Sequence, residues 1–205
     1  MLQNMQEFWY LYIILFVLII ITVFVWKKAA TAAARHKKEV NEIMAKAKRN
    51  KEIRDAYKDL TAQIIENAPA GSLFEGVALN LEAACQKAEN TENFYNSMTD
   101  GQKKIYAYYY LASEAKELKL SAFFKASSRP LTSDAVDAAE LFVSKEIYAV
   151  IKEMFDCYDE ENETASVIPQ NIDRLNEEFE KLTKDIDLFI PAGEYIKNNP
   201  DVFLK

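Results

Sequence analysis

The sequence predicts an all-α protein with a single N-terminal transmembrane helix, a helical stalk and a compact helical bundle domain. Residues 8–26 are apolar without interruption, and no glycine or proline occurs before Pro69. After Pro69 the apolar residues recur at helical spacing, and no segment alternates as a strand would. We therefore divide the chain into a transmembrane anchor (1–26), a basic helical stalk (27–68) and an acidic all-α soluble domain (69–205).

The anchor is predicted from the segment Phe8 to Trp26, FWYLYIILFVLIIITVFVW, which contains no charged residue, proline or glycine. About 20 mainly apolar residues are enough for a helix to cross the hydrocarbon of a bilayer, so we expect the lipid bilayer to be one partner of this chain. A cleaved signal peptide is the alternative, with residues 29–34 as its cleavage region. Residues 1–7 lack the basic charge of a signal peptide, which favours the anchor.

The charge on either side of this segment predicts its orientation. Residues 1–7 contain no Lys or Arg, whereas several basic residues follow the segment at once. The positive-inside rule then predicts a single-pass protein of the cell membrane, with its N-terminus outside and its C-terminal domain in the cytoplasm. The basic residues expected at the membrane surface are Lys27, Lys28, Arg35, Lys37 and Lys38.

The stalk is predicted to be one continuous helix, because residues 27–58 are good helix formers throughout. They hold 11 basic and 4 acidic residues, whereas residues 59–205 hold 14 basic and 27 acidic ones. Two apolar stripes, Val40 to Ala47 and Ile53 to Ile64, leave open a homodimer through the stalk. The alternative is that the second stripe packs against the domain.

The domain is predicted to contain successive helices separated by turns at 96–99, 127–132 and 159–166. Ser72 with Glu75, and Thr99 with Gln102, have the spacing of capping boxes. Ser133 is expected to begin a third helix, and apolar spacing from Ile147 to Phe155 predicts a fourth. Proline in the first helical turn is favourable, so Pro169 is expected to begin a fifth helix. A short last helix is expected from Pro191 to Lys197.

Residues suited to catalysis or metal binding are sparse, so we predict that the protein is not an enzyme and needs no cofactor or metal. The only histidine, His36, lies in the stalk, and the cysteines Cys85 and Cys157 lie in apolar helical contexts. The acidic segment 156–163 lacks the spacing of a calcium loop. A carboxylate pair, Glu114 and Glu117, is the remaining candidate for acid–base catalysis, and a solvated helix face is the simpler interpretation.

Residues 99–205 resemble the bacterial DNA-mimic protein family of small helical domains. The resemblance begins with Thr99 to Lys104 and the tyrosine-rich segment that follows. It continues through Ser121-Ala122-Phe123-Phe124 and Asp134 to Ala139, and it ends with Tyr195 to Pro200 and Phe203. The resemblance implies an all-helical domain that binds a protein through an acidic surface imitating phosphates, and it implies no catalytic residues.

The predicted function is therefore that of a membrane-anchored protein-binding module, whose DNA-mimic-like acidic domain engages a basic protein partner. Direct binding to nucleic acid is not expected, because phosphates and carboxylates repel each other. The alternative is a structural adaptor or an immunity-type protein of the cell envelope. The candidate partner-binding residues are Asp134, Asp137, Glu140, Asp156, Asp159, Glu160, Glu161 and Glu163.

Overall fold

A computed structural model describes residues 9–204 of the chain, without the side chains of residues 9–13, 19–23 and 30. All the regular structure in this part of the chain is helical, which confirms the all-α prediction. The chain divides into two compact units, Met1–Arg49 and Asn50–Lys205, which we call unit 1 and unit 2 and describe separately.

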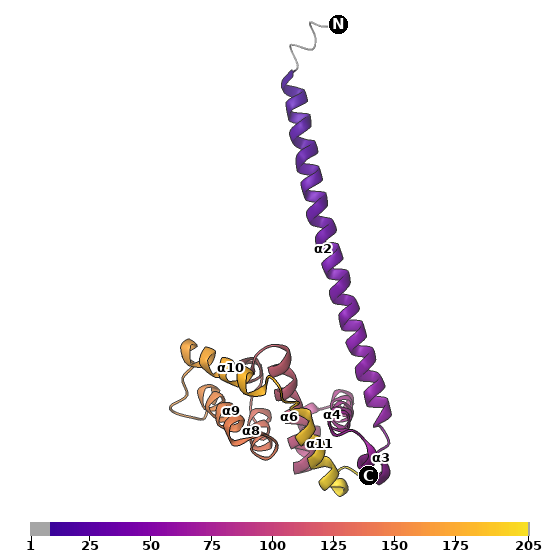
Figure 1. Ribbon diagram of the computed structural model, residues 1–205, viewed down its shortest axis with the longest axis vertical. Coiled ribbons are helices and arrows are strands. Elements are labelled where there is room, and N and C mark those ends of the chain that lie inside the picture. Colours follow the sequence, from indigo (N-terminus) through magenta and orange to yellow (C-terminus); the bar gives the residue numbers. More distant parts are fainter. Residues whose placement is uncertain (1–8, 205) are drawn as a thin grey trace. The chain divides into compact units, whose positions relative to one another are not determined.

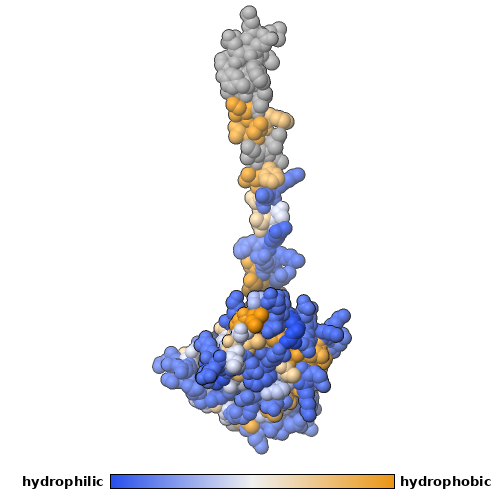
Figure 2. Space-filling view, turned by 90° about the vertical axis from the view of Figure 1, so that its left-hand side faces the viewer, coloured by the Kyte–Doolittle hydropathy of each residue, from blue (hydrophilic) through white to orange (hydrophobic). Residues whose placement is uncertain are grey.

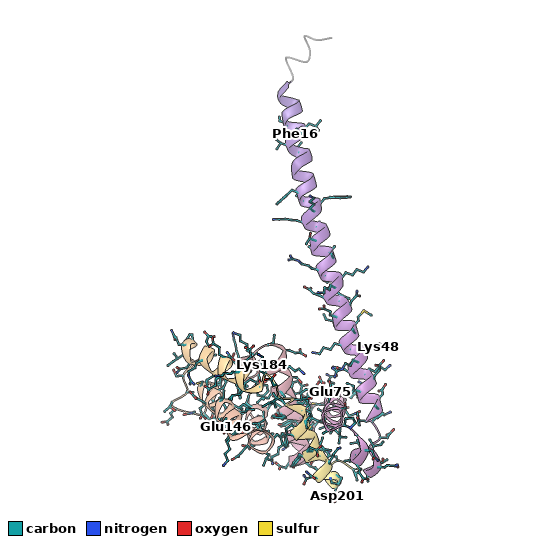
Figure 3. The ribbon with its side chains drawn as sticks, viewed as in Figure 1. Phe16, Lys48, Glu75, Glu146, Lys184 and Asp201 are labelled. Atoms are coloured by element: carbon teal, nitrogen blue, oxygen red, sulfur yellow. The ribbon has the colours of Figure 1, made fainter. Side chains whose placement is uncertain are left out.

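Unit 1 consists of most of the helix α2 (Trp9–Ala56), a single helix of 48 residues. The stalk predicted over residues 27–68 is one helix only as far as Ala56, because residues 57–61 are not helical. The described side chains of α2 within unit 1 are exposed, including Phe16, which projects from the helix in Figure 3. Apolar side chains from Ile14 to Leu18 and from Phe24 to Trp26 are between 47% and 79% exposed. Most of this apolar surface is therefore exposed within the described part of unit 1.

The described part of the chain contains no helix with both the length and the apolar character needed to cross a bilayer. The transmembrane helix predicted over residues 8–26 is therefore not supported. The described apolar stretches, 14–18 and 24–26, are short, and two lysines follow the second one directly. Phe8 and the side chains of residues 9–13 and 19–23, which are much of the predicted segment, lie outside the described residues.

Unit 2 is a helical bundle arranged around α6, which contacts α4, α7, α8 and α11 (Figure 1). Helix α9 packs between α8 and α10, and α11 packs most extensively against α4. Its helices are α3 (Ala62–Asn67), α4 (Ala70–Lys87), α5 (Thr91–Ser97), α6 (Asp100–Glu117), α7 (Leu120–Ala126), α8 (Leu131–Phe142), α9 (Lys145–Tyr158), α10 (Pro169–Thr183), α11 (Phe189–Asn198) and the 3₁₀ turn η1 (Pro200–Val202).

The core of unit 2 is built on the inward face of α6. Ile105, Tyr108 and Leu111 are fully buried there, one helical turn apart. The Tyr108 ring meets Phe142 of α8 edge to face at 5.0 Å, and its hydroxyl donates to the carbonyl oxygen of Leu188 at 3.2 Å. Burying a large apolar side chain contributes about 1.5–3 kcal/mol, so this helix is a principal source of stability.

The second apolar stripe of the predicted stalk packs against the core of unit 2. Tyr57 and Leu60 are half-buried and pack against the core. Asn80 of α4 donates from its side-chain nitrogen to the carbonyl oxygen of Arg54 at 2.9 Å, which fixes the end of α2 on the bundle. This supports the alternative that the stripe packs on the domain, and a homodimer through the stalk finds no support.

Two predicted helix starts are confirmed and two are wrong. The Thr99–Gln102 capping box is present, and Pro169 occupies the first turn of α10. The predicted Ser72–Glu75 box is absent, because α4 already begins at Ala70 and Glu75 is buried in its body (Figure 3). Helix α8 begins at Leu131, directly after Pro130, and not at Ser133.

A buried amide joins α7 to α10. The side-chain oxygen of Asn176 accepts from the backbone N–H of Ser121 at 3.0 Å, and its nitrogen donates to the Ser121 hydroxyl at 3.0 Å. Asn176→Leu removes both bonds while keeping a similar volume. We expect a loss of about 1–3 kcal/mol in the free energy of unfolding, measured by urea denaturation, because the N–H and the hydroxyl of the half-buried Ser121 lose their partner. The control Asn171→Leu, at an exposed position of α10, should cost far less.

Candidate protein-binding surface

Of the three predicted acidic residues of α8, one accepts a hydrogen bond within unit 2 and two face solvent. Asp134 is half-buried and accepts a short hydrogen bond from the hydroxyl of Tyr95. Burial, and next the hydrogen bond to Asp134, raise the pKa of Tyr95, so this hydroxyl remains a donor. Asp137 and Glu140 are exposed, one turn apart on the outer face of α8. Of the three, only these last two present exposed carboxylates to a partner.

Arg129 ties the loop before α8 to the loop after α9. Its guanidinium donates to both carboxylate oxygens of Asp159, at 3.0 and 2.6 Å, and to Glu161 at 2.5 Å. The Asp159 side chain is only 9% exposed, and the hydrogen bond from Arg129 holds its pKa below the usual range. Asp156 is also paired, with Lys152 at 2.7 Å. Two cations of the chain itself therefore pair with these three predicted residues and offset most of their charge.

The loop between α9 and α10 presents the remaining two predicted residues, Glu160 and Glu163, and both are exposed. Asn162 holds the backbone here, because its side-chain oxygen accepts from the N–H and the hydroxyl of Thr164 at 3.0 and 2.7 Å. Asn side chains commonly form such turns by bonding the backbone two residues on. Arg129 and Asn162 therefore hold the residues on either side of Glu160 and Glu163.

We expect Arg129→Met to loosen this loop without unfolding the bundle. Because the pKa of Asp159 is lowered in the folded protein, its contact with Arg129 is fully present above the ordinary carboxylate pKa. The contact is lost as the pH falls through the lowered pKa of Asp159 in the folded protein. Hydrogen exchange of amides 160–165 should therefore be faster in the variant at pH 7, and variant and parent should converge in acid. Lys125→Met, an exposed change on α7, is the control. Equal exchange at pH 7 would show that Arg129 does not hold the loop.

A row of acidic residues on α10 escaped the sequence prediction. Asp173, Glu177 and Glu180 are exposed and lie at i, i+4 and i+7, so they line one face of the helix. The opposite face, with Leu175 and Phe179, is buried. At about 1.5 Å of rise per residue the row extends over roughly 10 Å. The apolar spacing that predicted α10 also identifies which of its residues lie on the opposite face. That spacing is the signal from which the acidic row could have been predicted.

These residues define the acidic surface of unit 2: the row on α10 and the two free glutamates of the preceding loop. Figure 2 shows the end of the bundle that carries α9 and α10, and this face is hydrophilic over most of its area. Two exposed apolar side chains, Val167 and Ile168, stand between the loop and the row in sequence. The members of the acidic surface are Glu160, Glu163, Asp173, Glu177 and Glu180.

The acidic surface lies within a segment that matches a known protein family. Residues 96–199 match the model of the DMP19-like protein family, a segment that runs from the end of α5 to the end of α11. The chain belongs to the DMP19-like family. The match confirms the resemblance to DNA-mimic proteins seen in residues 99–205. No curated protein and no solved structure matches the chain.

The DMP19-like segment contains the whole acidic surface, whereas the predicted membrane-surface residues lie outside it. Those residues are all exposed on α2. The Lys28 ammonium lies 5.0 Å from the centre of the Phe24 ring, and Lys38 is 3.7 Å from Glu42. Both arrangements leave the ammonium groups accessible to solvent or to an anionic surface. The five residues are Lys27, Lys28, Arg35, Lys37 and Lys38.

The residues considered for catalysis in this DMP19-like chain do not come together in a cleft. Glu114 is half-buried, and burial, followed by the charge of Glu117, raises its pKa. Neither glutamate lines the cavity beside Arg129 and Phe155 or the cavity beside Phe179 and Leu188. Burial also raises the pKa of the Cys157 thiol, which keeps it protonated. The described residues include no group of side chains arranged to hold a metal ion.

Proposed function

We propose that unit 2 is a DNA-mimic module that binds the DNA-contacting face of a basic protein through its acidic surface. The observation that carries this proposal is the exposed row Asp173, Glu177 and Glu180 within the DMP19-like segment. These described carboxylates form no ion pair, since Arg174 of α10 pairs with Glu153 and with Glu178 at 3.1 Å, and Lys181, one turn after Glu177, pairs with none of them. A partner's lysines and arginines would supply the missing charge.

The physical basis is the way in which proteins bind DNA. Their affinity rests largely on Lys and Arg side chains that neutralise phosphates and release counterions, so it falls steeply with salt. A rigid line of carboxylates offers the same side chains an alternative anion. A duplex strand carries a phosphate about every 3.4 Å of its axis, so the row on α10 is sparser than DNA. The loop glutamates Glu160 and Glu163 would extend it.

The proposed role is binding and not catalysis. An acidic surface attracts a basic protein, speeds the encounter and selects among partners. The same charge repels nucleic acid, so we propose that DNA competes with this protein for the partner and does not bind to it.

Crosslinking in intact cells, followed by release of DNA, tests the proposal. A partner is first identified from crosslinks to residues 160–180. The purified partner is then bound to its labelled DNA, and the full-length protein is added at increasing salt. Release of the DNA at about 0.1 M salt, fading at higher salt, is the expected result. A complex of protein, partner and DNA together would contradict mimicry. Binding that persists unchanged at 1 M salt would favour the structural adaptor, with Val167 and Ile168 as apolar contacts.

We also propose that the N-terminal segment attaches this module to the cytoplasmic face of the cell membrane. The proposal depends on the sequence of residues 8–26 and on the exposed apolar side chains of Phe16, Phe24 and Trp26. Exposed side chains of this size are unfavourable in water and favourable in lipid. Basic residues near an anionic leaflet add about 1 kcal/mol each.

Cell fractionation and protease protection test this location. The full-length protein should sediment with membranes at high salt and enter solution only with detergent. Protease added to right-side-out cells should leave unit 2 intact. Full-length protein in the supernatant of cells lysed without detergent would contradict the attachment, and digestion of unit 2 from outside would contradict the orientation.

A further inference from the structure

A cavity of unit 2 is lined by no member of the acidic surface, and its lining contains two lysines and two aspartates. It has a volume of about 420 Å³ and opens between α6, the end of α10 and the start of α11. Ala112, Phe179 and Leu188 form its buried apolar floor. A cavity of this size lies within the range that small ligands occupy.

The walls of this cavity are fixed by hydrogen bonds. The Tyr108 hydroxyl donates to the carbonyl oxygen of Leu188 at 3.2 Å, and Ile186 donates its backbone N–H to the carbonyl oxygen of Thr183 at 3.0 Å. The Thr183 hydroxyl is itself bonded to the carbonyl oxygen of Phe179 at 2.8 Å. The turn between α10 and α11 is therefore held in shape before any ligand arrives, which reduces the ordering cost of binding.

Two lysines stand at the mouth of the cavity. Lys116 of α6 lies with its ammonium 5.8 Å from the centre of the Phe189 ring, and Lys184 follows the end of α10 (Figure 3). Within the described part of the chain neither lysine forms an ion pair, although unit 2 is acidic overall. Of the two acidic residues in the wall, Asp187 already accepts from the backbone N–H of Phe189 at 3.0 Å, and Asp185 is exposed to solvent.

Ile186 adds apolar surface at the same mouth, since it lines the cavity and remains 48% exposed. An occupant that fits must therefore combine an aliphatic part, which the floor and Ile186 would cover, with a negative charge that the lysines can bind. A carboxylate meets this requirement, because it can accept hydrogen bonds from both lysines.

We propose that this cavity is a binding site for a short aliphatic carboxylate, with Lys116 and Lys184 binding the carboxylate and Phe179 and Leu188 contacting the chain. The site is independent of the acidic surface, so binding there does not require the DNA-mimic function. Unit 2 would then bind a small molecule in addition to its protein partner.

Methyl NMR of the full-length protein in phosphatidylcholine nanodiscs tests the site, with hexanoate as the probe. Hexanoate should shift the Ile186 methyl signal saturably and leave that of Ile105, buried in the core, unchanged. Hexanol, which has the same chain without the charge, should bind at least fivefold more weakly. Lys116→Met and Lys184→Met should each raise the Kd for hexanoate at least threefold, and the double variant at least tenfold.

Matched variants distinguish this site from general attraction to positive charge. Lys181→Met changes an exposed lysine of α10 that does not line the cavity, and it should leave the Kd unchanged. Ala115→Met fills part of the cavity and should weaken hexanoate and hexanol alike. The unchanged Ile105 signal confirms that each variant is folded. Absence of a saturable Ile186 shift, equal Kd values for hexanoate and hexanol, or an unchanged Kd in the lysine double variant would overturn the proposal.

Discussion

Gly193→Ala is expected to destabilise unit 2 by roughly 2–4 kcal/mol, because overpacking against a rigid neighbour costs about 1–3 kcal/mol and occasionally more. A Cβ atom at position 193 would lie 2.0 Å from the carbonyl oxygen of Ala70 and 2.4 Å from its carbonyl carbon. Both atoms belong to the backbone of α4, so no side-chain rotation can relieve the contact. Helices α4 and α11 would have to move apart along the most extensive contact between helices in the bundle.

Gly71→Ala is the matched control for this experiment. A Cβ atom there would meet Asp187 at 3.5 Å and Phe189 at 3.7 Å, which are ordinary contacts. Alanine favours a helix over glycine by about 1 kcal/mol, so this variant should be at least as stable as the parent. Thermal unfolding measures both, since 1 kcal/mol shifts the Tm of a domain of roughly 150 residues by about 2–4 °C. A Gly193→Ala variant as stable as the parent would show that the two helices approach less closely than described.

This contact also explains why the start of α4 could not be predicted from local sequence. Ser72 and Glu75 have the spacing of a capping box, and local rules alone favour a helix that begins there. The packing of Ala70 against Gly193 favours three further helical residues at the start of α4, and Glu75 is buried. Residues 70 and 193 are far apart in sequence, and no local pattern links them.

The longer helices were predictable because each carries several turns of apolar spacing. The helices from Ile105, from Ile147 and from Ile172 buried the faces that their periodicity predicted. The short helices α3, α5 and α7 were not predicted as separate helices, since six or seven residues show too little periodicity to reveal where one helix ends and the next begins. Tertiary contacts such as the bond between Ser121 and Asn176 define them.

The acidic surface, too, could be predicted only in part from local sequence. Composition located the negative charge in the correct part of the chain, but it could not tell a free carboxylate from a paired one. Asp159 and Glu161 form the densest acidic segment in sequence, yet they are the pair bound by Arg129, which lies about 30 residues away. The free row on α10 is less conspicuous, because its residues are separated by the apolar residues of the buried face.

Neutralising that row with Asp173→Asn, Glu177→Gln and Glu180→Gln together is expected to weaken binding of the crosslinked partner by roughly 10- to 100-fold at low salt. Each exposed charge pair contributes up to about 1 kcal/mol, and a tenfold change in Kd corresponds to about 1.4 kcal/mol. The affinity should also depend less steeply on salt, because fewer counterions are released when fewer charges meet. Calorimetric titration at several salt concentrations measures both effects.

The triple variant Glu66→Gln, Glu89→Gln and Glu92→Gln changes the net charge by the same amount at exposed positions outside the matched segment. If the partner responded only to overall charge, the two triple variants would weaken binding equally. If it docks on α10, only the first should do so, while both keep the stability of the parent within about 0.5 kcal/mol, as surface changes generally do. The comparison thus separates recognition of a particular row of carboxylates from the general solubilising effect of an acidic domain, which is the distinction on which the DNA-mimic interpretation depends.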